Sequence, residues 1–106
     1  GHRYDAVATE AAAQSRASYV ALLGSKRKTI LIYEALFERG MSMDRVRELR
    51  SPSGLDIQAR TPEEIAVSIV AEMLMFRLGG DGSPMKLEER HLQRIQSKSA
   101  ATAAAD

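Results

Sequence analysis

The chain has 106 residues, of which 44% are hydrophobic, so it holds at most one domain of ordinary size. Its formal net charge of +1 argues against a nucleic-acid binder, and the absence of cysteine excludes disulfides, thiolate metal sites and cysteine nucleophiles. No apolar run approaches the roughly 20 residues that a membrane span needs, and the chain opens without the basic-then-apolar pattern of a signal peptide. We therefore expect a cytoplasmic protein.

The first third of the sequence predicts a helix, a strand and a second helix. Residues 5–17 are rich in alanine, the best helix former, and predict a short helix. Residues 18–23 form an apolar run without polar alternation, which is typical of a strand covered on both faces. In the competing interpretation these residues join a helix in an all-α bundle. The strand-forming Tyr19 and Val20 argue against it.

Two further helices are predicted before a loop. Residues 26–39 place Ile30, Tyr33 and Phe37 on one helical face with Ile32 and Leu36 beside them, and Gly40 ends this helix. Ser42 is a suitable N-cap for a short helix over residues 43–50. Residues 51–60 contain proline and glycine and predict a loop that includes a strand of two or three residues.

The clearest helix start is at residues 61–64, where Thr61 and Glu64 fit a capping box around Pro62. The apolar face of the following helix, residues 62–78, is wide, which predicts a well-buried helix. Residues 79–84 predict a flexible linker, residues 85–96 a weak amphipathic helix, and residues 97–106 a disordered tail. We therefore divide the chain into a folded part, residues 1–80, and a tail region, residues 81–106.

A lone strand leaves its backbone N–H and C=O groups unpaired, so the predicted strand requires neighbours. The sequence contains one convincing strand, and we expect its neighbours to come from an N-terminal part outside this sequence, from another chain, or from a swapped copy of this one. A homodimer or a swapped dimer is thus one predicted arrangement. The fold class that we predict is α/β, helix-rich, with one clear strand and a sheet that is incomplete within this chain.

The turn between the strand and the second helix predicts an anion site. Gly24 ends the apolar run, and Ser25, Lys26, Arg27 and Lys28 follow at once. Backbone N–H groups and the helix dipole at such a turn attract anions such as phosphate. The alternative is a tight turn followed by a solvated basic first turn. Cations at a helix N-terminus oppose the dipole unless an anion is near, which favours the binding interpretation.

Two blocks of this sequence resemble the XdhC/CoxI family, the xanthine dehydrogenase accessory proteins. The first is Ser18-Tyr19-Val20-Ala21-Leu22-Leu23-Gly24-Ser25-Lys26-Arg27-Lys28, and the second runs from Pro52-Ser53-Gly54-Leu55-Asp56-Ile57 through Thr61-Pro62-Glu63-Glu64-Ile65 to Glu72. The opening residues 1–5 are similar to a short motif of the same family. The resemblance covers residues 1 to about 80.

The resemblance implies that this chain is the second half of a Rossmann-like domain. It implies a maturation factor of chaperone type for bacterial molybdenum hydroxylases, which binds the molybdenum cofactor (molybdopterin) and aids its insertion into the apo-enzyme. The partner would be a hydroxylase of the xanthine dehydrogenase or carbon monoxide dehydrogenase type. It also implies that the loop with Gly54 and Asp56 lies at the rim of the cofactor crevice.

The sequence departs from the family pattern at several points. It has no Gly-x-Gly-x-x-Gly turn, Ser53 stands where the family usually has a bulkier apolar residue, and Gln58 stands where it often has glycine. The alternatives are a nucleotide- or NAD(P)-binding domain of an oxidoreductase and a helical interaction module without a ligand. The predicted binding residues are Gly24, Ser25, Lys26, Arg27, Gly54 and Asp56.

We predict no catalytic residues and no metal ligands. Glu63 and Glu64 are adjacent, so they point to different sides of a helix, and Glu72 has no histidine placed near it. His2 and His91 lack metal-ligand spacing.

Overall fold

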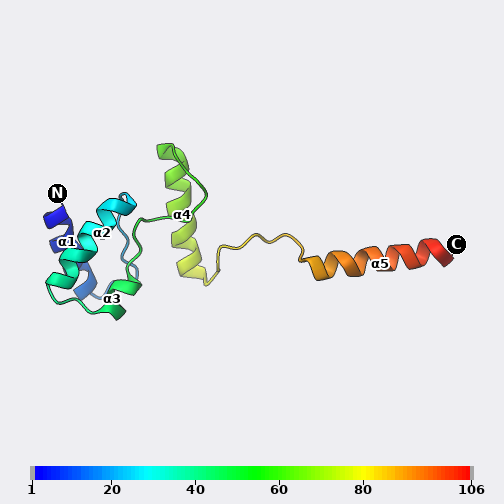
Figure 1. Cartoon of the computed structure of the whole chain (residues 1–106), viewed down its shortest axis with the longest axis horizontal. Coiled ribbons are helices and arrows are strands. Elements are labelled where there is room, and N and C mark those ends of the chain that lie inside the picture. The colour runs from blue at the N-terminus through cyan, green and yellow to red at the C-terminus, as the bar shows by residue number, and fades with distance from the viewer. Residues whose placement is uncertain (1, 106) are drawn as a thin grey trace.

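The computed structural model describes residues 2–105, which contain five helices (Figure 1). In chain order they are α1 (His2–Gln14), α2 (Lys26–Glu38), α3 (Met43–Glu48), α4 (Pro62–Leu78) and α5 (Glu89–Ala105). Ser25, Ser42 and Thr61 are the N-caps of α2, α3 and α4, and each side chain accepts a hydrogen bond from the backbone three residues later. None of these helices has the length and apolar character that crossing a bilayer requires.

Residues 18–23 are extended, so the interpretation that places them in a helix is wrong. Ala21 forms an isolated parallel bridge with Arg50: Leu22 donates its N–H to the Arg50 carbonyl at 2.9 Å, and Arg50 donates to the Val20 carbonyl at 3.0 Å. The prediction of a clear strand is not confirmed, because the described residues contain this bridge and no named strand. One neighbour of the segment lies within the chain, contrary to our expectation. This neighbour, residues 50–53, overlaps the loop of residues 51–60 in which we predicted a short strand, but its pairing with residues 18–23 was not predicted.

The core lies between α1, α2 and the loop that follows α3. Its buried hydrophobic residues are Ala6, Ala13, Ile32, Leu36 and Leu49. The small side chains of Ala6 and Ala13 allow α1 to pack closely against α2. Of the apolar residues that we predicted to face the core from α2, Ile32 and Leu36 are buried, whereas Ile30 and Phe37 are 53% and 40% exposed. The polar Thr29 is buried as well. Thr29 is satisfied by hydrogen bonds to the Ser25 carbonyl at 3.0 Å and the Ser51 hydroxyl at 2.7 Å.

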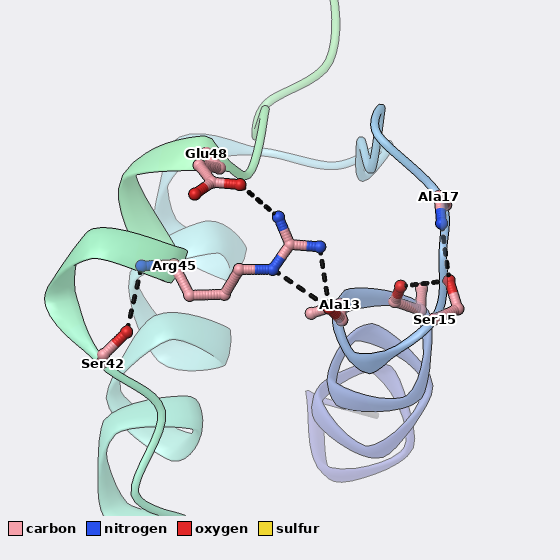
Figure 2. A network of polar contacts seen from close by, with 7 residues as sticks. Ala13, Ser15, Ala17, Ser42, Arg45 and Glu48 are labelled. Carbon is pink, nitrogen blue, oxygen red and sulfur yellow. Dashed lines mark hydrogen bonds and ion pairs between the residues drawn. The ribbon is translucent and has the colours of Figure 1, made fainter.

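An arginine from α3 holds the C-terminal end of α1 (Figure 2). The Arg45 guanidinium donates to the Ala13 carbonyl from Nε at 3.0 Å and from Nη2 at 2.7 Å. Nη1 of the same side chain pairs with Glu48. Carbonyls in the last turn of a helix have no partner within the helix, so Arg45 satisfies one of them and ties α3 to α1.

Helix α4 begins with the predicted capping box, in which Glu64 Oε1 accepts from the Thr61 N–H at 2.9 Å. It is not the well-buried helix that we expected. Its buried residues are the polar Ser68 and Glu72, whereas Val67, Val70 and Leu74 are 61%, 53% and 47% exposed. The wide apolar face of α4 predicted burial on several sides. The helix is buried only on the side where other described residues pack against it.

Helix α5 projects away from the rest of the molecule at the end of an extended linker (Figure 1). The radius of gyration is 21.1 Å, against about 13 Å for a compact chain of this size. The predicted disordered tail is wrong for residues 97–105, which continue α5. Their composition, which we took as low complexity, is rich in alanine and therefore favours helix.

Candidate functional site

A broad open groove of about 930 Å³ lies where the two bridged segments end. Its walls come from the turn before α2, from the loop between α3 and α4, and from the first turns of α4. The lining residues are Leu23, Gly24, Lys26, residues 52–60, Pro62, Ile65 and Ser68. Because Ala21 and Arg50 pair in parallel, both loops leave the bridge at its carboxyl end. This is the end at which open α/β folds bind ligands.

Four of the six predicted site residues line this groove. Gly24 lies in the turn before α2 and Lys26 is the first residue of α2, whereas Gly54 and Asp56 come from the loop before α4. The structure therefore brings together two blocks that are separated by the whole of α2 and α3. Their role in binding stays a prediction.

The other two predicted residues, Ser25 and Arg27, do not line the groove. Ser25 is occupied as the N-cap of α2, where its hydroxyl accepts from the Lys28 N–H at 3.1 Å. Lys28, a further cation of the predicted anion site, forms an ion pair with Asp5 at 2.8 Å. Among these residues Lys26 is thus the cation that faces the groove, and Arg60 is a second cation on the opposite loop.

Gly54 lies directly against α4. Its φ of +110° is in a region that L-residues rarely adopt, and a Cβ there would lie 2.5 Å from Ser68 Oγ and 3.3 Å from the Ser68 carbonyl carbon. The next residue, Leu55, donates its N–H to the Ser68 carbonyl at 3.1 Å. Glycine is therefore required for the loop to rest on the helix and to form the floor of the groove.

A buried carboxylate fixes this loop and the extended segment to α4. Glu72 is 7% exposed, and its Oε1 accepts from the Tyr19 hydroxyl at 2.9 Å and from the Gly54 N–H at 3.2 Å. Its Oε2 lies 3.8 Å from Arg50 Nη1. A buried carboxylate costs free energy unless it is paired and hydrogen-bonded, and here both conditions are met. We call Tyr19, Arg50, Gly54 and Glu72 the Glu72 cluster.

Aromatic contacts surround the Glu72 cluster. The rings of Tyr19 and Phe76 lie 5.1 Å apart in a tilted arrangement, and the Arg50 guanidinium lies 5.3 Å from the Phe76 ring centroid and 5.8 Å from that of Tyr19. Burial raises the pKa of the Tyr19 hydroxyl above its ordinary value of 10.0, and the hydrogen bond to Glu72 raises it further. Tyr19 is therefore a neutral donor at physiological pH.

Asp56 is held by its own loop. Its Oδ1 accepts from the Gln58 backbone N–H at 3.2 Å and from the Gln58 side-chain amide at 2.9 Å. Gln58 has a φ of +60°, which is uncommon for a residue other than glycine. The two hydrogen bonds to Asp56 offset part of the cost of that conformation. The second Asp56 oxygen, Oδ2, forms no hydrogen bond within the described residues.

The Glu72 cluster was not predicted from the sequence. The signal was present as polar residues at positions 68 and 72, one helical turn apart, within an otherwise apolar run. Such a pair predicts that this face packs against polar backbone, which is what Ser68 and Glu72 do. A periodic sequence pattern does not identify the partners of Glu72, because they lie at positions 19, 50 and 54, far from it in the sequence.

The groove offers a mixed set of binding groups. Lys26 and Arg60 supply positive charge, Asp56 supplies a carboxylate, and apolar walls come from Leu23, Ile57 and Ile65. Its volume is within the range of about 300–1,000 Å³ of small-molecule sites. The two cations suit a ligand that carries an anionic group.

The pattern of a known family, the XdhC Rossmann domain, matches residues 1–73. The chain is 37% identical over 68 residues to an uncharacterized protein, YqeB, of Escherichia coli K12, a match that covers 64% of this chain and 13% of YqeB. It is 33% identical over 69 residues to the molybdenum cofactor insertion chaperone PaoD of Escherichia coli K12, covering 65% of this chain and 22% of PaoD. The matches thus span about an eighth and about a fifth of these curated relatives.

The family match covers more than half of the chain and contains both loops of the groove as well as Glu72. It ends inside α4, before the linker and α5 begin. The chain belongs to the XdhC Rossmann domain family.

Proposed function

We propose that this chain takes part in the maturation of a molybdenum enzyme by binding the molybdenum cofactor in the groove and aiding its insertion into the apo-enzyme. The observation that carries the proposal is the meeting of the Gly24–Lys26 turn with the Gly54–Asp56 loop at one groove. The likeness to PaoD, whose name states cofactor insertion, supports the choice of cargo.

The proposed orientation follows from the charges that line the groove. The phosphate end of the cofactor lies toward Lys26 and the N-terminus of α2, where the helix dipole favours negative charge. The pterin lies over the apolar wall toward Asp56, whose carboxylate accepts hydrogen bonds from ring N–H groups. Arg60 stands on the same loop as Asp56 and limits the negative charge there.

The open form of the groove suits a carrier. An enzyme that retains its cofactor encloses most of it, whereas this groove exposes one side to solvent. A ligand held on one side can be released when the apo-enzyme offers a closed site. The proposed client is a molybdenum hydroxylase of the xanthine dehydrogenase or carbon monoxide dehydrogenase type, in the cytoplasm.

The test is a calorimetric titration of the full chain with molybdopterin, with NAD(P) titrated in parallel. We expect molybdopterin to bind and expect Lys26→Ala to weaken binding about tenfold, which corresponds to loss of one charge-assisted contact. Arg27→Ala is the matched control, because Arg27 is adjacent but does not line the groove. Binding of NAD(P) without the pterin would instead assign the groove to a nucleotide.

A further inference from the structure

One oxygen of the groove carboxylate Asp56 is occupied by a neighbour in its own loop. Oδ1 accepts two hydrogen bonds from Gln58, one from the backbone N–H at 3.2 Å and one from the side-chain Nε2 at 2.9 Å. A carboxylate oxygen has two lone pairs, so these two bonds saturate Oδ1. Oδ2 stays open within the described residues. Asp56 and Gln58 both line the groove and are exposed, so a ligand has access to them.

The two hydrogen bonds from Gln58 have different consequences for a ligand. The backbone bond closes a short turn and orients the carboxylate, and any side chain at position 58 is compatible with it. The side-chain bond occupies the acceptor position that an incoming donor would use. Because a carboxylate only accepts hydrogen bonds, the amide nitrogen and not the amide oxygen must face it. Gln58 therefore presents to Asp56 the same kind of donor that a ligand would offer.

The backbone conformation at position 58 does not call for a side chain. Gln58 has a φ of +60°, which residues with a Cβ adopt at a cost and glycine adopts freely. Glycine at this position would keep the backbone bond to Asp56 and avoid the cost, but it would leave one acceptor position of Oδ1 open. The Gln58 side chain therefore supplies a contact that the turn itself does not need.

The open and the saturated oxygen together determine which ligands the Gln58 amide affects. A ligand with a single N–H donor can bind Oδ2 without disturbing Gln58. An edge with two adjacent, parallel N–H donors, such as the N3–H and the 2-amino group of a pterin, needs one acceptor position on each oxygen. For such an edge to bind, the amide must leave Oδ1.

We propose that the Gln58 side chain is an intramolecular competitor for the two-donor edge of the ligand at Asp56, and that binding displaces its amide from Oδ1. The proposal rests on the proposed function for the identity of the ring. It adds the edge that is recognised and the residue that lowers the affinity. A lowered affinity suits a protein that releases its cargo, because the amide returns to Asp56 as the ligand leaves.

Two substitutions at position 58 separate the hydrogen bond from the bulk of the side chain. Gln58→Ala removes both, whereas Gln58→Met removes the donor and keeps a side chain of similar length. Each should raise the affinity for pterin about threefold, which corresponds to one hydrogen bond in an exposed site. Lumazine has an oxo group in place of the 2-amino group and offers no paired donors, so its affinity should stay within about 1.5-fold. Fluorescence titration of either ring with the full chain measures these values.

A nuclear magnetic resonance signature follows the amide itself. The chain has four glutamines and no asparagine, so the side-chain amide signals are few, and the spectrum of Gln58→Met assigns that of Gln58. Saturation with pterin should shift this signal, whereas lumazine should leave it unchanged. Asp56→Asn should remove the preference for pterin over lumazine, because its side chain has only one acceptor oxygen.

The possible outcomes distinguish this proposal from the proposed function. Equal pterin affinities of the native chain and both Gln58 variants would overturn the proposal, and so would a gain in Gln58→Ala alone, which would indicate bulk instead of the hydrogen bond. Failure of pterin to bind any of the three chains would overturn it as well. In each case binding of molybdopterin would leave the proposed function standing. The expected effects with pterin, without binding of molybdopterin, would support the competitor and reject the cofactor.

Discussion

At the scale of single residues, Glu72 is the side chain on which the site depends most. It is buried, and its two oxygens bridge the extended segment, the groove loop and the end of the bridge through Tyr19, Gly54 and Arg50. Each donor would be left unpaired by an apolar residue at position 72. The carboxylate therefore holds Gly54, which lines the groove, although Glu72 itself does not line it.

We expect Glu72→Leu to destabilise the fold by about 3 kcal/mol or more, because removal of a buried partner leaves the donors unpaired. Glu72→Gln keeps an acceptor oxygen and loses the ion pair, so its cost should be about 1–2 kcal/mol. Urea unfolding measures both values. Glu34→Gln, an exposed change on α2, is the control and should stay within about 0.5 kcal/mol. Equal effects of Glu72→Leu and the control would contradict this role.

The capping box makes stability depend on pH through Glu64. Hydrogen bonds from the N–H groups of Thr61 and Arg60 lower the pKa of Glu64 below its ordinary value of 4.5. The folded state therefore binds this proton less readily than the unfolded state, so the stabilisation is present above pH 4.5 and is lost as the pH falls through the lowered pKa.

We expect the difference in melting temperature between the native chain and Glu64→Gln to be largest near neutral pH and to shrink below about pH 4. Thermal melts followed by circular dichroism between pH 3 and pH 7 measure it. Because other carboxylates titrate in both proteins, the difference isolates Glu64. A difference that stays constant across this range would show that the Glu64 charge has no part in the cap.

At the scale of elements, apolar side chains join α1 to α2, whereas polar contacts of Arg45 join α3 to α1. Arg45 is the main link between α3 and α1, through two hydrogen bonds to the Ala13 carbonyl. Within the described residues, Arg47, two positions later, pairs only with the exposed Asp44 of its own helix, at 3.3 Å. The two arginines therefore form a natural comparison.

Arg45→Ala should cost about 1.5–3 kcal/mol, because charged hydrogen bonds to a helix-terminal carbonyl are lost. Arg47→Ala should cost at most about 1 kcal/mol, as exposed ion pairs contribute little. Hydrogen exchange of the α1 amides reports the consequence directly: faster exchange at the C-terminal end of α1 in Arg45→Ala alone is the expected outcome. Equal exchange in the two variants would refute the link.

Local signals in the sequence predicted the elements better than their packing. The cap residues Ser25, Ser42 and Thr61 act within three residues of their partners, so the starts of α2, α3 and α4 were correct. The burial of Glu72 and the parallel bridge between Ala21 and Arg50 join distant positions, which a periodic pattern does not encode. The groove was predicted in part, since glycine and charged residues marked its two loops but not its walls.

At the scale of the whole molecule, residues 79–88 separate two parts of very different character. The helices before them surround a core, whereas α5 stands apart with Leu92 and Ile95 exposed (Figure 1). Asp81 and Ser83 form a local turn by hydrogen bonds of 2.9 and 2.7 Å. Gly79, Gly80 and Gly82 give the remainder of the linker little restraint.

Limited proteolysis should therefore cut first within residues 79–88, since exposed segments rich in glycine are preferred sites. The N-terminal product should retain the melting temperature of the intact chain, because the core and the Glu72 cluster lie before residue 79. Mass spectrometry and circular dichroism give the two readouts. A first cut inside α2 or α4, or a lower melting temperature after cleavage, would contradict this division.

The parallel bridge also determines the order in which the chain can assemble. Ala21 and Arg50 meet only after the intervening segment, α2 and α3 included, has closed as a loop, and closure of a long loop is slow compared with local helix formation. The residues that donate to Glu72 lie both before and after the segment between Ala21 and Arg50. Helix α4 can therefore pack in its final position only after this segment has closed. In a refolding experiment with pulsed hydrogen exchange, the α2 amides should gain protection before the Leu22 and Gly54 amides. The groove would thus be the last feature of the molecule to form.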